Sequence, residues 1–222
     1  GAILGDRIRM NSYYNDDNVF IRSISSRGSL GGISEKTDLI LEVFDSSSFD
    51  VVLVETVGVG QVELDVMDCV DCLILSLVPE SGDDIQTMKA GLMEVPDIFV
   101  VNKSDRPGAK KVEFYVKSML EDNLRKVERK PPVIKASYKD KESVKKIYDE
   151  IVSFWSWQKK EGLLKMNQNE RYKSIINNNL INIFQKSIWT KENKNKLKKY
   201  ISSSNFKERN PIIFSEKLFN KW

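Results

Sequence analysis

The sequence predicts an α/β domain built around a buried parallel sheet, followed by a helical arm. Short apolar runs alternate with amphipathic stretches in the first part of the chain, and the net charge changes sign where this alternation stops. With 222 residues, of which 41% are hydrophobic, the chain can bury one core of ordinary size and carry an appendage. We therefore expect the α/β domain at residues 1–157 and the helical arm at residues 158–222.

Four apolar runs are predicted strands, because each is bounded by turn residues and is apolar on both faces, as in a covered parallel sheet. The amphipathic stretches between them predict helices that cover the two faces of this sheet. The strands are expected at FDVVLVE (49–55), DCLILSLVPE (71–80), PDIFVVNKSD (96–105) and PPVIKAS (131–137), and the helices from about Glu35, Gln61, Asp83, Lys110 and Lys141.

The tail is rich in lysine and asparagine and carries 15 Lys and Arg against 5 Asp and Glu, whereas the rest of the chain has a net charge of −7. Apolar residues at helical spacing predict a helix, and SSSNFKERNP (202–211) predicts a break. We expect a solvated basic face rather than a nucleic-acid or lipid site, because Phe184, Trp189 and Phe214 suit helix packing. The helical spacing runs through Leu164, Tyr172, Ile175, Ile176, Leu180, Ile183 and Phe184.

No apolar run is long enough to cross a membrane, because the longest, CLILSLV (72–78), is far short of the roughly 18 residues that a spanning helix needs. We therefore expect a soluble protein. The start, GAILGDRIRM, has neither an initiator methionine nor the features of a signal peptide, so a fragment is expected. Cys69 and Cys72 form a C-x-x-C pair, but the chain has no histidine to complete a zinc site, which favours reduced structural thiols over a metal or redox site.

The predicted strand at 96–105 ends in N-K-S-D, at the edge where ligands lie in such sheets. The carboxylate of Asp105 can accept hydrogen bonds from the N1–H and the exocyclic amine of guanine together, a pair of donors that adenine does not offer. The Asn102 amide can hold neighbouring loops, and the stem of Lys103 can lie along the base. The alternative interpretation is a polar turn without a ligand.

A second polar segment, ETVGVGQ (55–61), follows the predicted strand at 49–55. Glu55 would lie where the Mg²⁺ of a bound nucleotide, or its water shell, is held. Gly58 would let a backbone N–H face the terminal phosphate, and the glycine-rich NVFIRSISSRGSLGGIS (18–34) offers further amides and arginines. The acidic residue Glu55, the glycine turn at Gly58 and the N-K-S-D motif come in the order that a GTPase requires. This order favours a GTPase over a set of unrelated turns.

Five segments of the chain carry a resemblance to a known family: GAILGDRIRM, NVFIRSISSRGSLGGIS, FDVVLVETVGVGQVE, VPESGDDIQTMKAGLMEVPDIFVVNKSD and VIKAS. They resemble the methylmalonyl-CoA mutase-associated GTPase chaperones, also called ArgK or MeaB, from Gly1 to about Trp157, whereas the tail resembles the family's dimerisation arm only in character. The resemblance implies a P-loop GTPase-type sheet, GTP or GDP with Mg²⁺, and a homodimer. It also implies a cobalamin-dependent acyl-CoA mutase as partner, in the cytoplasm or, in a eukaryote, the mitochondrial matrix.

The resemblance implies roles for further residues. Asp6 would lie near the Mg²⁺ site in a first switch region. Ala136 and Ser137 stand where a base-contacting S-A-x turn is usual, here with alanine before serine, and a backbone N–H of this turn is expected to meet the guanine O6. A further switch that communicates with the partner enzyme matches Ser81, Gly82, Asp83, Asp84, Gln86 and Lys89.

The sequence contains no G-x-x-x-x-G-K-[ST] phosphate-binding loop, although the family carries one upstream of the segment that matches Gly1. We therefore expect a GTPase in the intact protein, and a chain that lacks the P-loop and the first strand and binds GTP poorly alone. Two alternatives are a non-catalytic dimerising interaction module and a sister GTPase that inserts nickel into a metalloenzyme. The second kind carries metal-binding His or Cys clusters.

Overall fold

The computed structural model describes residues 10, 13, 15–24, 37–56, 66–67, 69–81, 96–123, 129–203 and 210–219. The chain divides into two compact units, Gly1–Gln168 and Asn169–Trp222. In the described ranges the first unit holds a sheet with its covering helices, and the second holds helices alone. None of the helices in these ranges is long and apolar enough to span a membrane.

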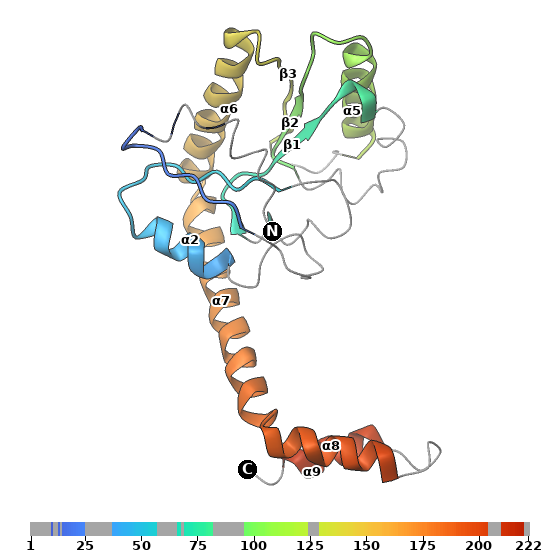
Figure 1. The fold of residues 1–222 in the computed structure, drawn as a ribbon. Helices are drawn as coiled ribbons and strands as arrows, with labels where there is room; N and C mark the ends of the chain where they lie inside the picture. Colours follow the sequence, from blue (N-terminus) through green and yellow to red (C-terminus); the bar gives the residue numbers. More distant parts are fainter. Residues whose placement is uncertain are drawn as a thin grey trace. The chain divides into compact units, whose positions relative to one another are not determined.

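The sheet of the first unit is parallel, as predicted. Its described strands are β1 (Ile74–Leu77), β2 (Ile98–Val101) and β3 (Val133–Lys135), in the order β1-β2-β3 (Figure 1). All four residues of β2 are buried, because this strand pairs on both sides and is covered on both faces. The uninterrupted apolar sequence IFVV is what such a central position requires.

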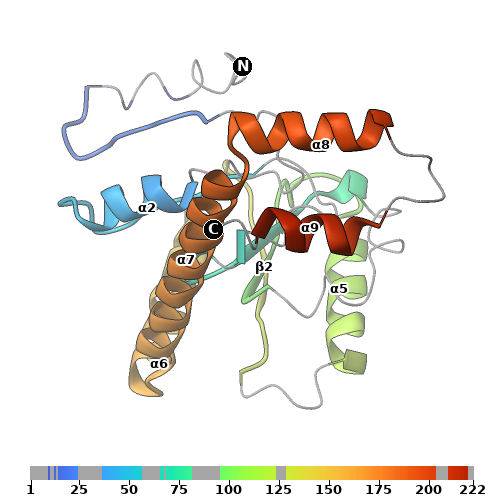
Figure 2. The same ribbon diagram turned by 90° about the horizontal axis from the view of Figure 1, so that it is seen from below.

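Alternate side chains of β2 point to opposite faces of the sheet, and each face has its own helix. Phe99 packs with α5 (Ala109–Asn123), whereas Ile98 lies in a second cluster that packs with α6 (Lys141–Lys160). Figures 1 and 2 show these two helices on opposite sides of the strands. Both helices were expected, and both are confirmed. The α5 cluster consists of Leu77, Phe99, Val101, Ala109, Val112, Val116 and Leu120, and the α6 cluster of Ile98, Val100 and Ala136 with Ile147 and Ile151 against it.

The run predicted as a strand at 49–55 is not a strand, so this prediction was wrong. Residues 51–56 form no ladder in the described part of the chain, although exposure alternates along them and Val51 and Leu53 are exposed. A strand requires hydrogen bonds to a neighbour, and among the described strands β1 pairs only with β2. An apolar run indicates a tendency to be buried, whereas the ladder depends on a partner that the run itself does not specify.

Helix α2 (Thr37–Asp45) confirms the helix expected from about Glu35. The ring of Phe44 contacts those of Phe20 and Phe49, with centroids 5.7 and 6.1 Å apart, so α2 packs with the segments before and after it. The helix predicted from about Asp83 lies outside the described residues, and of the one predicted from about Gln61 the structure describes only residues 66, 67 and 69, which form 3-10 turns.

Helix α7 (Leu163–Ile188) confirms the helix predicted around Leu164 to Phe184 and spans the boundary of the two units. In the second unit α8 (Lys191–Ser203) ends, and α9 (Pro211–Phe219) begins, inside the predicted break. Asn210 caps α9, because its Oδ1 accepts the N–H groups of Ile212 and Ile213, each at 3.1 Å. The rings of Tyr200 and Phe214 stack with centroids 4.5 Å apart and hold α8 against α9.

Candidate functional site

The candidate site lies at the carboxyl ends of β2 and β3. The N-K-S-D segment directly follows β2, and a short turn connects β3 to α6. Two main-chain hydrogen bonds join these loops: the Ala136 N–H donates to the Val101 carbonyl (2.9 Å), and the Ser104 N–H donates to the Ala136 carbonyl (3.0 Å). The pairing of the parallel strands therefore continues into the loops and fixes their spacing.

The loop after β2 turns sharply at Lys103, whose φ of +53° is in the left-handed region that residues other than glycine rarely adopt. The Lys103 N–H donates to Oδ1 of Asn102 (2.7 Å), and the Lys103 carbonyl accepts the N–H of Arg106 (2.9 Å). The Asn102 N–H donates to the Leu77 carbonyl at the end of β1 (2.7 Å). Asn102 thus stabilises the turn through its side chain and ties it to β1 through its main chain.

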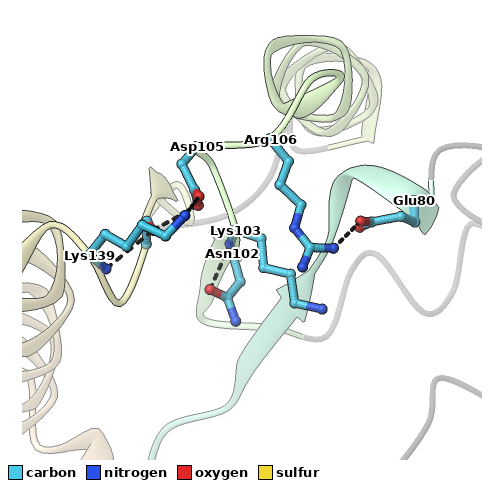
Figure 3. Close-up of polar contacts among 7 residues, drawn as sticks. Glu80, Asn102, Lys103, Asp105, Arg106 and Lys139 are labelled. Atoms are coloured by element: carbon cyan, nitrogen blue, oxygen red, sulfur yellow. Dashed lines mark hydrogen bonds and ion pairs between the residues drawn. The ribbon is translucent and has the colours of Figure 1, made fainter.

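Both carboxylate oxygens of Asp105 accept hydrogen bonds from the turn after β3. The Lys139 ammonium donates to Oδ2 (2.7 Å; Figure 3), and the Ser137 hydroxyl donates to Oδ1 (2.8 Å). These two bonds, that of Lys139 first, lower the pKa of Asp105 to about 2. The group is therefore an ionised acceptor at neutral pH, and with 32% of its side chain exposed it is open to a ligand.

The first turn of α6 fixes Ser137, which is only 3% exposed. The Ser137 N–H donates to Oγ of Ser143 (3.1 Å), and that hydroxyl donates to the Asp140 carbonyl (2.6 Å). Asp140 also caps α6, because its Oδ1 accepts the Glu142 N–H (3.1 Å). The helix start therefore sets where the Ser137 hydroxyl lies against Asp105.

Lys139 is the residue of this site that the sequence reasoning missed. It lies two residues after Ser137, and its hydrogen bond to Asp105 raises its own pKa. Its ammonium also lies 5.7 Å from the ring centre of Tyr138, which is exposed. The sequence signal for it was a lysine in the turn after the strand that neighbours the N-K-S-D strand. Neighbouring parallel strands end at the same edge of a sheet, so this lysine can reach the N-K-S-D loop.

A further contact joins the N-K-S-D loop to the segment after β1. Arg106 forms an ion pair with Glu80 in the short helical turn η3 (Pro79–Ser81; Figure 3), and its hydrogen bond lowers the pKa of Glu80. Gly108 has a φ of +93°, and a Cβ added there would lie 3.6 Å from the Pro79 Cβ. The N-K-S-D loop is therefore held by the segments that follow both neighbouring strands.

The contacts bring together five of the predicted site residues: Asn102, Lys103, Asp105, Ala136 and Ser137. Glu55 is exposed at the end of residues 51–56, and the contacts described above do not include it. Of Ser81 only the main chain is described, in η3. The other predicted site residues lie outside the described residues: Asp6, Gly58, Gly82, Asp83, Asp84, Gln86 and Lys89.

The described residues of this site suit a nucleotide base better than a metal ion. An ionised, partly exposed carboxylate with two oxygens matches a planar edge with two adjacent N–H donors. Within the described ranges no three or more Cys, Asp or Glu side chains gather as metal ligands would, and of the two residues predicted for Mg²⁺ only Glu55 is described. Burial, and then the charge of Asp97, raises the pKa of Cys72 to about 12, so the thiolate that metal or redox chemistry needs is disfavoured.

Comparison with known proteins links the chain to one family. The sequence profile described as "Methylmalonyl Co-A mutase-associated GTPase MeaB" matches residues 1–193. A protein of Pyrococcus abyssi is 42% identical over 179 residues, which cover 79% of this chain and 55% of that protein. GTPase ArgK of Escherichia coli is 39% identical over 159 residues, covering 69% of this chain and 48% of its own.

A mitochondrial "methylmalonic aciduria type A homolog" of Caenorhabditis elegans is 31% identical over 194 residues, covering 84% of this chain and 49% of its own. The chain thus spans about half the length of the curated relatives it matches. The crystal structure of an LAO/AO transport system kinase superposes with a TM-score of 0.67 at 24% identity, covering 95% of this chain and 68% of that one. This likeness confirms the predicted fold class, a P-loop GTPase-type parallel sheet with flanking helices.

Proposed function

The chain belongs to the methylmalonyl Co-A mutase-associated GTPase MeaB family, and from this premise we propose that it carries the guanine-recognition part of a GTP-binding chaperone. In the whole protein this chaperone hydrolyses GTP and protects a cobalamin-dependent acyl-CoA mutase of the methylmalonyl-CoA mutase type, or assists its cofactor loading. The family's description and the names of the Escherichia coli and Caenorhabditis elegans relatives support this proposal.

The observation that carries the proposal is the carboxylate of Asp105 at the carboxyl edge of the sheet. It is ionised, a third exposed, and oriented by a buried hydroxyl and a lysine. Guanine presents N1–H and its exocyclic amine side by side, so each carboxylate oxygen can accept one of them. Adenine presents an unprotonated N1 at the same place, which repels a carboxylate oxygen.

This difference is large enough to select the nucleotide. Guanine makes a bidentate, charge-assisted contact that adenine does not make, and this difference corresponds to a binding free energy on the order of 2 to 4 kcal/mol. The half-buried Lys103 is proposed to lay its stem along the base plane. A main-chain N–H of Ala136 or Ser137 is proposed to meet the guanine O6. It would have to share or exchange its present acceptor, which is the Val101 carbonyl for Ala136 and Oγ of Ser143 for Ser137.

The phosphate end of the proposed site lies largely outside the described residues. Bound Mg²⁺ would neutralise charge on the phosphates, with Glu55 and Asp6 as its proposed ligands, directly or through water. Gly58 is proposed to turn a backbone N–H toward the terminal phosphate, since glycine places no Cβ there. Glu55 is exposed, as a carboxylate that reaches such an ion would need to be.

The remaining proposals concern partners and location. Residues 81–89 are proposed to communicate with the mutase, and the arm at 158–222 to form a homodimer. The cytoplasm is the proposed location, or the mitochondrial matrix in a eukaryote, as the name of the Caenorhabditis elegans relative says of that protein. A nickel-inserting sister GTPase has no support from a chain without histidine.

The proposal is tested by calorimetric titration of this chain with GTP and ATP, and by assaying GTP hydrolysis in a chain extended upstream by a family-like segment, with and without the mutase. Preference for GTP in the first assay and mutase-dependent hydrolysis in the second would support it. Equal affinity for GTP and ATP, with no hydrolysis after extension, would instead indicate a non-catalytic interaction module.

A further inference from the structure

We propose that Lys139 is a specificity-determining residue that competes with the exocyclic amine of guanine for Oδ2 of Asp105. The inference rests on the proposed function, because it assumes that Asp105 reads the base. It concerns a different property, namely how strongly the site separates guanine from a purine that lacks the exocyclic amine. The contacts of the two carboxylate oxygens carry it.

The hydrogen-bond donors to the two oxygens of Asp105 differ in how firmly the fold holds them. Oδ1 accepts from Ser137, a residue that is 3% exposed and whose main chain is fixed by the first turn of α6. Oδ2 accepts from Lys139, whose side chain is 59% exposed and reaches the carboxylate on a flexible four-carbon stem (Figure 3). The contact at Oδ1 is therefore built into the fold, whereas the contact at Oδ2 can be exchanged.

A guanine edge needs both oxygens at once, because its two N–H donors are adjacent. Each carboxylate oxygen has room for two donors, so Ser137 can keep its bond while Oδ1 accepts N1–H of the base. The exocyclic amine must then bond Oδ2, where the Lys139 ammonium lies 2.7 Å away. Unlike the neutral Ser137 hydroxyl at Oδ1, this ammonium brings a full positive charge, which weakens the bond of a second donor to Oδ2 as long as Lys139 stays. Hypoxanthine has N1–H but no exocyclic amine, so it is satisfied by one oxygen and leaves Lys139 in place.

Tyr138 gives the displaced ammonium a second position. The Lys139 Nζ already lies 5.7 Å from the centre of the Tyr138 ring, and 81% of Tyr138 is exposed. An ammonium over an aromatic face is attracted to the ring, so Lys139 need not return fully to water when a base takes Oδ2. Because exposed ion pairs are weak, the competition should lower the preference for guanine over hypoxanthine by about two- to fivefold.

The test compares binding of GMP and IMP to the full chain by chemical-shift titration, in the wild type and in Lys139→Met, Lys139→Arg and Lys145→Met. The ratio of the two affinities cancels any general effect of charge on the nucleotide phosphate. We expect Lys139→Met to raise the GMP-to-IMP affinity ratio about two- to fivefold. Lys139→Arg, which keeps a cation, and Lys145→Met, which removes an exposed cation from α6, should leave the ratio nearly unchanged.

A ratio that is unchanged or lower in Lys139→Met would overturn the inference, while GMP binding itself would still support the proposed function. Failure of every form to bind GMP, in this chain and in the chain extended upstream, would contradict the proposed function and the inference with it. A second measurement needs no nucleotide: the pKa of the Asp105 carboxyl, followed by carbon NMR, should rise in Lys139→Met and stay low in Lys145→Met. An unchanged Asp105 pKa would show that the pair does not form in solution, which overturns the inference alone.

Discussion

Arg106 forms an ion pair with Glu80 and so joins the loop that carries Asp105 to the turn that leads into residues 82–90 (Figure 3). The two side chains are 50% and 54% exposed, and an ion pair this exposed adds little to the stability of the fold. Glu80 directly precedes the proposed partner-facing segment in the sequence, which suggests a role for this ion pair in communication between that segment and the proposed base reader.

We therefore predict that Glu80→Gln leaves thermal stability nearly unchanged but weakens the stimulation of GTP hydrolysis by the mutase, measured in the chain extended upstream. Charge reversal at Asp83, Asp84 and Lys89 should weaken it further, since these residues are proposed to face the partner. Glu121→Gln is the control, because Glu121 is exposed and paired with Lys130 away from this loop. Stimulation that survives all of these changes would show that the segment does not transmit partner binding.

Ser137→Ala tests whether the buried hydroxyl supports the site. The substitution removes the donor to Oδ1 of Asp105 and should lower the free energy of unfolding by about 1 kcal/mol, with weaker GMP binding. Denaturant unfolding and the GMP titration measure the two effects. Ser156→Ala, which removes an exposed hydroxyl bonded to its own helix, is the matched control. Equal losses of stability and of GMP binding in the two variants would contradict a special role for Ser137.

Asp97 predicts a pH dependence of stability. It precedes β2, its Oδ2 accepts the Leu73 N–H (2.7 Å), and burial raises its pKa to about 6 against the opposing effects of that bond and of Arg129. A carboxyl whose pKa is higher in the folded than in the unfolded chain stabilises the fold when protonated. Its contribution to the free energy of unfolding should therefore decline as pH rises from about 4 to about 6, and stay constant above.

Asp97→Asn keeps an acceptor for Leu73 and removes the buried charge, so it should abolish this decline and stabilise the fold at pH 7 by about 1 to 2 kcal/mol. Urea unfolding at several pH values, compared with Asp149→Asn on the exposed side of α6, measures the difference. An Asp97→Asn variant less stable than the wild type at pH 7 would mean that the ionised carboxylate, with Arg129 nearby, is a net stabiliser.

The arm at 158–222 is predicted to form a dimer contact. Along α7, Tyr172, Ile176, Leu180 and Ile183 are exposed at helical spacing, and an exposed apolar stripe of this kind is typical of a surface that another chain covers. Sedimentation of the full chain should therefore report a dimer, and truncation after Gln158 a monomer. Leu180→Glu should act like the truncation without removing the helix. If the full chain also sediments as a monomer, the stripe is not a dimer contact.

Much of the fold could be predicted because its signals are local. The start of α6 follows from Asp140, a capping residue placed directly before an amphipathic stretch, and the burial of β2 follows from four consecutive apolar residues. Residues 51–56 show the limit, because their apolar run resembles that of β2 but makes no described ladder. Strand pairing depends on a partner elsewhere in the chain, which an apolar run does not specify.

The candidate site, like the fold, could be predicted where its signals are local in the sequence. Asp105 was identified because its motif is contiguous, and Ser137 because the family resemblance implies a base-contacting turn there, but Lys139 was missed. Its role depends on the φ of +53° at Lys103 and on the start of α6. Together these bring two loops into contact in which Asp105 and Ser137 are 32 positions apart in the sequence. Such a contact is a property of the folded edge rather than of either sequence segment.

The central claim, that Asp105 reads a guanine base, is tested most directly by Asp105→Asn and competition titrations with GTP, ATP and XTP, on this chain and on the chain extended upstream. Xanthine presents a carbonyl where guanine presents its exocyclic amine, so an amide donor fits where a carboxylate acceptor did. The account predicts that Asp105→Asn changes the preference from GTP to XTP, whereas Asp149→Asn keeps the preference for GTP. If Asp105→Asn still prefers GTP to the same degree, N-K-S-D is not the base reader and the proposed function is contradicted.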